Sequence, residues 1–155
     1  HLLSRRQRQM CIRDRGKVEH LDNAGSVPVA PVGGVVSRQA YMLRIPLDFE
    51  YEKEIVEGTY YEYILTDTIA NIQIISLTAY DESHPAGTDV NELFMNYPLR
   101  QEDQLTDYKY GYMYGTVFYK IPRTLPQAGV HRFKVVVTTR KGEEFTKETD
   151  EITMQ

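Results

Sequence analysis

The stretch QAYMLRIPLDFEYE, residues 39–52, carries the clearest structural pattern in the sequence. Apolar and aromatic side chains occupy every second position, namely Tyr41, Leu43, Ile45, Leu47, Phe49 and Tyr51. Charged residues fill three of the positions between them. A period of two over this length predicts a β-strand with one buried face. Pro46 has no N–H to donate, so it predicts an edge strand or a bulge at that point.

Extended segments also lie on both sides of this stretch. Residues 16–36 begin with a short alternating piece and continue as a loop rich in Gly, Pro and small side chains. Residues 58–65 are again rich in β-forming residues. In NIQIISLTAY, residues 71–80, the apolar positions change register after Ile74 and resume at Ile75, which predicts a β-bulge there.

The C-terminal part predicts a hairpin and, before it, one helical turn. Phe133, Val135 and Val137 alternate as inward side chains, Lys141-Gly142 forms the turn, and Phe145 begins the return strand. Further upstream, TDVNELF (residues 88–94) predicts a short helical turn, because Asp89 and Glu92 have the spacing of a capping box.

Together these segments predict an all-β fold of about seven strands, an immunoglobulin-like β-sandwich with one short helical turn near residues 88–94. A closed barrel has the same sequence pattern and stays an alternative. A chain of 155 residues is enough for one domain with its own core. No apolar run approaches the roughly 20 residues of a membrane helix, and no signal peptide is evident.

The first 15 residues differ in composition from the rest. RRQRQMCIRDR, residues 5–15, is either a basic tail, a solvated end or a non-native leader, and we favour the last interpretation. Its string MCIRDR resembles translated sequencing-adapter sequence, and the composition changes abruptly at Gly16. Cys11, the only cysteine, has neither the small residues nor the apolar stretch of a lipid-attachment site before it. We therefore expect an unstructured leader at 1–15 and one β-sandwich domain at 16–155.

Net charge separates the two parts and excludes one class of partner. Residues 1–15 hold five Arg and one Asp, a net charge of +4, whereas the whole chain carries −4, which leaves −8 for residues 16–155. Phosphate neutralisation by Lys and Arg supplies most of the affinity for nucleic acids. An acidic body therefore argues against a nucleic-acid partner.

Three stretches resemble an uncharacterised family of Bacteroidetes lipoproteins, a domain of unknown function. They are LDNAGSVPV with AYMLRI (residues 21–29 and 40–45), ISLTAYDESHPAGTDVNELF (residues 75–94), and LPQAGVHRFKVVVT with GEEFTKET (residues 125–138 and 142–149). The resemblance implies an all-β body in the cell envelope, periplasmic or on the outer membrane, held by a lipid on an N-terminal Cys. This chain lacks that Cys and the signal peptide. The resemblance implies no activity and no cofactor.

Residues with catalytic or metal-binding chemistry are few. The sequence has no nucleophile elbow, no phosphate-binding Gly loop and no zinc-protease motif. Its strongest polar cluster is DESHPAGTD, residues 81–89, with Asp81, Glu82, His84 and Asp89. These side chains suit a cation loop or a zinc site, but their spacing matches no EF-hand. We favour a structural turn set by Pro85 and Gly87, with no metal.

The candidate binding residues are four tyrosines in YKYGYMYG, residues 108–115: Tyr108, Tyr110, Tyr112 and Tyr114. In an extended chain all four project from one face, where phenol rings hold sugar or peptide ligands by stacking and hydrogen bonds. Ordinary cross-strand packing is the other interpretation, and we favour it. Tyr60, Tyr61 and Tyr63 invite the same two interpretations.

We therefore expect a non-catalytic envelope lipoprotein domain that binds a glycan or an envelope protein or serves as a structural module. Its membrane contact would run through a lipid anchor absent from this chain. The alternative is an accessory domain of a polysaccharide-active hydrolase or lyase, which requires paired carboxylates in a cleft.

Overall fold

The computed structural model describes residues 8–13, 17–50, 63–65, 69–97 and 116–155, and these residues are all-β apart from single 3-10 turns. The strands are β1 (Arg8–Arg13), β2 (Glu19–Asp22), β3 (Val35–Val36), β4 (Tyr41–Glu50), β5 (Tyr63–Leu65), β6 (Ile69–Ser76), β7 (Phe94–Asn96), β8 (Thr116–Pro122), β9 (Gly129–His131), β10 (Phe133–Thr139), β11 (Glu144–Glu148) and β12 (Ile152–Met154). The turns are η1 (Val32–Gly34), η2 (Arg38–Ala40) and η3 (Asn91–Leu93). Among these described residues, no helix is long and apolar enough to cross a membrane.

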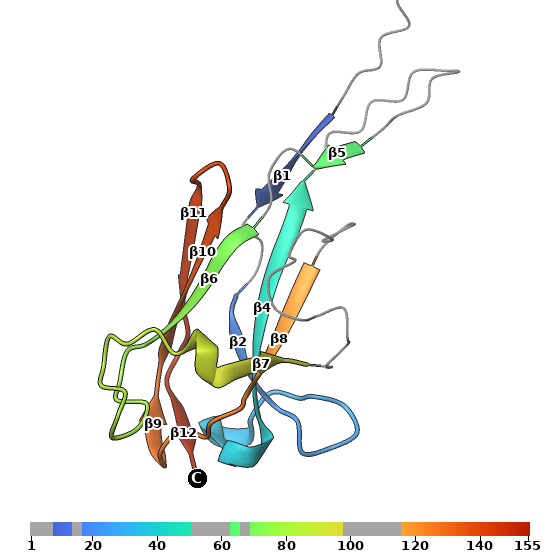
Figure 1. Cartoon of the computed structure of the whole chain (residues 1–155). Coiled ribbons are helices and arrows are strands. Elements are labelled where there is room, and N and C mark those ends of the chain that lie inside the picture. Colours follow the sequence, from blue (N-terminus) through green and yellow to red (C-terminus); the bar gives the residue numbers. More distant parts are fainter. Residues whose placement is uncertain (1–7, 14–16, 51–62, 66–68, 98–115) are drawn as a thin grey trace, which may run out of the picture.

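The strands form three sheets (Figure 1). The largest has the order β5-β1-β4-β8-β7, with β2 also beside β4. The second has the order β11-β10-β6, and the third is the short sheet β3-β12-β9. In Figure 1, β9 and β12 lie below β10 and β11 on the same side of the molecule, opposite β4 and β8.

The sheets share one hydrophobic core, so the predicted all-β sandwich is confirmed. Leu43 and Ile45 of β4 belong to the same buried cluster as Ile72 of β6 and Val135 of β10. The ring of Phe133 lies across the core from Tyr41, with ring centroids 6.0 Å apart. Burial of such side chains from facing sheets is the main driving force for a sandwich fold.

Strand β4 has the register that its sequence predicts over the part with described side chains. Tyr41, Leu43 and Ile45 are at most 1% exposed, whereas Arg44 is half-buried. Leu47, Phe49 and Tyr51 lie outside the described side chains. The prediction that Pro46 marks an edge strand was wrong, because β4 is an interior strand of the large sheet.

The position of Pro46 is nevertheless one that suits a missing N–H. Along one edge of β4, residues 41–44 pair with β2 and residues 48–50 pair with β1. Pro46 falls in the break between these two ladders, while its other edge faces Val117 of β8. A proline is tolerated where the ladder is interrupted, because no partner is left without a donor.

The predicted bulge near Ile74 and Ile75 is wrong in position. The register of β6 against β10 shifts at the start of the strand, where Thr138 pairs with Asn71 and Thr139 with Ile69. From Ile72 the inward positions continue through Ile74 to Ser76, all buried. Ile75 therefore points to the outer face of the sheet, where it is half-buried.

The C-terminal hairpin and the helical turn are confirmed. β10 and β11 pair antiparallel, with Phe133, Val135 and Val137 buried. The connection contains Gly142 at φ 89°, a left-handed value that favours glycine. The turn near residues 88–94 is η3. The described strands outnumber the predicted seven, because strands of two to four residues such as β3 and β9 are too short to show a period.

Residues 1–15 differ from expectation in one respect. Arg8–Arg13 form β1, which pairs antiparallel with residues 48–50 of β4 and parallel with β5. A segment can pair through its backbone with a free strand edge without alternating apolar and polar side chains. The sequence of residues 8–13 therefore did not predict β1. The interpretation of 1–15 as a non-native leader stays a prediction.

Candidate functional site

The polar cluster of residues 81–89 lies in the loop that follows β6. Its backbone closes on itself, because Tyr80 N donates to His84 O (2.9 Å) and Gly87 N donates to Ser76 O (2.7 Å). Gly87 has φ 89°, and Thr88 Oγ1 donates to Pro85 O (2.6 Å). The loop therefore has a defined shape that is set by its own sequence.

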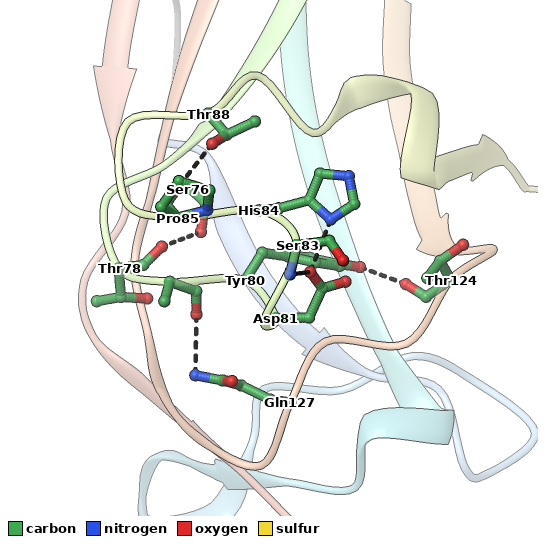
Figure 2. A network of polar contacts seen from close by, with 11 residues as sticks. Ser76, Thr78, Tyr80, Asp81, Ser83, His84, Pro85, Thr88, Thr124 and Gln127 are labelled. Carbon is green, nitrogen blue, oxygen red and sulfur yellow. Dashed lines mark hydrogen bonds and ion pairs between the residues drawn. The ribbon is translucent and has the colours of Figure 1, made fainter.

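Asp81 and His84 are hydrogen-bonded to each other inside this loop (Figure 2). His84 Nδ1 lies 2.7 Å from Asp81 Oδ1, and Ser83 N donates to the same oxygen at 2.9 Å. The hydrogen bond with His84 lowers the pKa of the Asp81 carboxyl, and the bond from Ser83 adds to this effect. The carboxylate stabilises a tight turn, as Asp commonly does.

Tyr80 connects the loop to the core. Tyr80 is fully buried. The centroid of its ring lies 6.0 Å from that of Phe94 and 6.1 Å from that of His131. The hydroxyl donates to Thr124 O at 2.5 Å (Figure 2). Burial raises the pKa of this phenol far above its ordinary value, so Tyr80 stays neutral. Tyr80 therefore fixes the loop against the segment of residues 124–127.

The remaining acidic residues of the cluster have separate surroundings. Asp89 Oδ1 accepts from Asn91 N (3.0 Å) at the start of η3 and from Ile74 N (3.2 Å) of β6. Glu82 is exposed, and so is Glu92, which follows the cluster in η3. Within the described ranges, no group of three His, Cys, Asp or Glu side chains comes close enough to hold a metal ion. The hydrogen bonds that Asp81 and Asp89 accept agree with the interpretation of this stretch as a structural turn.

The four candidate tyrosines fall outside the described residues, so their role stays a prediction. They are Tyr108, Tyr110, Tyr112 and Tyr114. Tyr60 and Tyr61 also lie outside them, and Tyr63 lies in β5 with no described side chain.

Sequence reasoning missed the structural use of two histidines. His20 Nε2 donates to Asp150 O and its Nδ1 accepts from the Tyr41 hydroxyl, both at 2.7 Å. His131 is 1% exposed, and its Nε2 donates to Gln127 O at 2.7 Å. Burial lowers the pKa of both imidazoles. A single histidine in an apolar strand has no motif, and its partner here is a backbone carbonyl that the sequence does not single out.

An exposed apolar surface was also missed. Five valines are exposed by between 37% and 89%, namely Val27, Val29, Val32, Val35 and Val130. Four of them belong to the Pro- and Gly-rich loop of residues 23–36, whose composition indicates only a loop. We call these five residues the valine surface.

A family described as a domain of unknown function (DUF5034) matches residues 15–150. No curated protein and no solved structure matches the chain.

Proposed function

The chain belongs to the DUF5034 family, and we propose that this domain is a non-catalytic module of the cell envelope that binds another protein through its valine surface. Exposed apolar side chains on a folded domain commonly mark interaction sites. The valine surface is the observation that carries the proposal.

Val27, Val29 and Val32 of the valine surface lie between β2 and β3, and its other two residues lie in a sheet. Val35 of β3 and Val130 of β9 both lie opposite Thr153 of β12, so the three side chains share one face. The opposite face of the same sheet is buried, with Val36 and Met154 in the core. No charged residue occurs between residues 23 and 37. A partner that covers this loop therefore buries no unpaired charge of the loop.

The loop is also held in one shape before any partner arrives. Asp22 and Val29 exchange two backbone hydrogen bonds, of 2.7 and 3.0 Å. Gly33 and Gly34 have φ values of 64° and 68°, which lets the chain turn sharply after Val32. Val32 is 89% exposed at this turn. A preformed loop loses little conformational entropy on binding, which favours affinity.

The described histidines support a non-catalytic role. His20 uses both ring nitrogens within the fold, and His131 is buried. His84 is held by Asp81, and no described hydroxyl or thiol group hydrogen-bonds to its ring. A general base needs a free ring nitrogen, and His20 has none because both of its nitrogens are bonded within the fold.

The described carboxylates that form ion pairs do not support the polysaccharide-active alternative. Glu19 lies 3.5 Å from Arg44 and Glu148 lies 2.6 Å from Arg132, while Asp81 contacts His84. Each is paired with a cationic or basic group, whereas glycoside cleavage requires two carboxylates facing one cleft. The lipid anchor and the envelope location are part of the proposal, and the family resemblance of residues 21–149 supports them.

The test compares Val32→Asp/Val130→Asp with the wild-type domain. Both substitutions are at exposed positions, so the melting temperature should stay within a few degrees of wild type. Detergent-solubilised envelope extract is passed over immobilised wild type, over this variant and over Lys134→Asp as a matched control on another sheet. A protein retained by wild type and control and lost by the variant supports the proposal.

Two other results would overturn it. Retention of the same proteins by all three forms would show that the valine surface does not bind. Release of reducing sugar from polysaccharide by the purified domain would show an enzyme, and a glycan-array signal unaffected by the valine substitutions would show a different binding site.

A further inference from the structure

Three side chains hold the segment of residues 124–127 against the fold. His131 Nε2 donates to Gln127 O (2.7 Å), Arg38 Nη1 donates to Pro126 O (3.1 Å), and the Tyr80 hydroxyl donates to Thr124 O. Gln127 itself donates from its backbone N to Tyr80 O at 2.8 Å. These contacts come from η2, β9 and the loop after β6, so the segment joins three separate parts of the chain.

His131 is the only one of these three groups whose charge changes near neutral pH. Because a carbonyl accepts from Nε2, this nitrogen carries the proton and Nδ1 has only a lone pair. Nδ1 is fully buried and has no hydrogen-bond partner. The ring stacks on Phe133 at an interplanar angle of 9°, and Tyr80 lies edge-on to it.

The surroundings of this ring disfavour a positive charge. Arg38 already places a guanidinium on the neighbouring carbonyl of Pro126. Tyr80 from the loop after β6 is neutral, and β12 places the apolar Ile152 opposite His131. Phe133 of β10 is apolar as well. A proton on Nδ1 would therefore be a buried donor without an acceptor.

We propose that His131 is an acid-sensitive latch: when its ring becomes protonated, residues 124–127 lift away to let water reach the imidazolium, while the sandwich stays folded. Burial is the main cause of the lowered pKa of His131, and the bond to Gln127 opposes it in part. The closed form thus binds a proton less readily than the open form. Lowering the pH through the ordinary histidine range therefore favours opening.

The chain around the segment suits a local movement. On one side Arg123 N and Thr124 N donate to Leu93 O, at 2.7 and 3.1 Å, and so anchor the start of the segment. On the other side Gly129 has φ 134°, a conformation that favours glycine. None of the ladder bonds of β4, β6 or β10 involves residues 124–127. Opening therefore leaves the sheets paired, and the inference does not depend on the proposed protein-binding function.

Amide hydrogen exchange followed by NMR tests the latch on the full chain. The reporter is the Gln127 amide, and the reference is the Val135 amide in the central strand β10. After correction for the intrinsic exchange rate, the protection of Gln127 should fall by about tenfold for each pH unit between the pKa values of the open and closed forms. The protection of Val135 should stay constant between pH 7.5 and pH 5.

Two variants assign the effect to a residue. In His131→Phe the stacking ring is kept and the titrating group is lost, so the acid dependence of Gln127 protection should vanish. His20→Gln removes the half-buried histidine of β2 and should leave the acid dependence intact. Acid dependence that persists in His131→Phe, or that vanishes in His20→Gln, would overturn the proposal.

A measurement on the wild-type chain covers the case in which His131→Phe does not fold. The Cε1–H resonance of His131 should titrate with its midpoint at the pH where half of the molecules are open at Gln127, below the pH at which Gln127 protection begins to fall. If the ring stays neutral at a pH where Gln127 is already open, the latch is refuted. Simultaneous loss of protection at Gln127 and Val135 would show global unfolding instead, and would refute it too.

Discussion

Lys120 is a charged residue on the core-facing side of β8. It pairs with Leu43 of β4 on one side and with Asn96 of β7 on the other, and it is only 4% exposed. Asn96 Oδ1 is buried without a hydrogen-bond partner. Burial lowers the pKa of its ammonium group to about 8. The folded state therefore disfavours the charged form.

Replacing this lysine should stabilise the protein. The folded pKa is below that of the unfolded chain, so wild-type stability should rise as the pH increases from about 8 to about 10.5 and stay low below that window. Lys120→Met should remove this rise and should be more stable than wild type at pH 7, by up to about 3 kcal/mol. Urea denaturation across this pH range measures both effects. A less stable variant would contradict the prediction.

The neighbouring positions 43 and 44 in β4 should differ strongly in how much stability a polar substitution costs. Leu43 is completely buried, so Leu43→Asp buries an unpaired carboxylate and should unfold the domain. Arg44 has a side chain that is 32% exposed and forms a surface ion pair with Glu19, so Arg44→Ser should change stability by under about 1 kcal/mol. Circular dichroism and urea denaturation compare the two. Greater damage from Arg44→Ser would place the core on the other face.

At the scale of elements, two acidic residues near the loop after β6, Asp89 and Glu92, should contribute differently to the stability of η3. Asp89 Oδ1 accepts two backbone N–H groups, whereas Glu92 is exposed. Asp89→Ala leaves these donors without their acceptor and should reduce the free energy of unfolding by about 1–2 kcal/mol. Glu92→Ala should change it by less than about 0.5 kcal/mol. Equal losses in the two variants would restore the capping box that the spacing predicts.

Strands with a long run of alternating apolar residues were predictable from the sequence, whereas very short strands defined by backbone pairing were not. The register of β4 at residues 41–45 and the hairpin of β10 and β11 follow from alternating apolar residues. Strands β3 and β9 contain two and three residues, which is less than two periods. The bulge was misplaced because Ile75 is apolar but faces outward, where half-burial tolerates either kind of side chain.

The candidate site shows the same division. The turn at residues 81–89 was predictable, because Asp, Pro and Gly at fixed positions specify a turn. The latch at His131 was not, because its partner is the Gln127 carbonyl and every residue has a carbonyl. The valine surface was hidden for a different reason. A valine within a loop has no pattern that distinguishes an exposed position from a buried one.

At the scale of the whole molecule, the two ends of residues 18–155 are joined. His20 Nε2 donates to Asp150 O, and Arg38 N donates to Gln155 O at 3.0 Å. Gln155 N donates to Val36 O at 3.0 Å, and the buried cluster runs from Val18 to Met154. The last strand thus packs beside the first part of this region, which makes the described sandwich a closed unit.

This closure leads to the prediction for residues 1–15. Strand β1 pairs with the end of β4 at residues 48–50, beyond the part of β4 that pairs with β2, and the family match begins only at residue 15. Deleting residues 1–15 should therefore change the melting temperature by less than about 3 °C, which for a domain of this size corresponds to under about 1 kcal/mol. Differential scanning calorimetry of the full chain and of residues 16–155 measures the change. A fall of several degrees would show that β1 stabilises the sandwich, and the interpretation of residues 1–15 as a non-native leader would then be wrong.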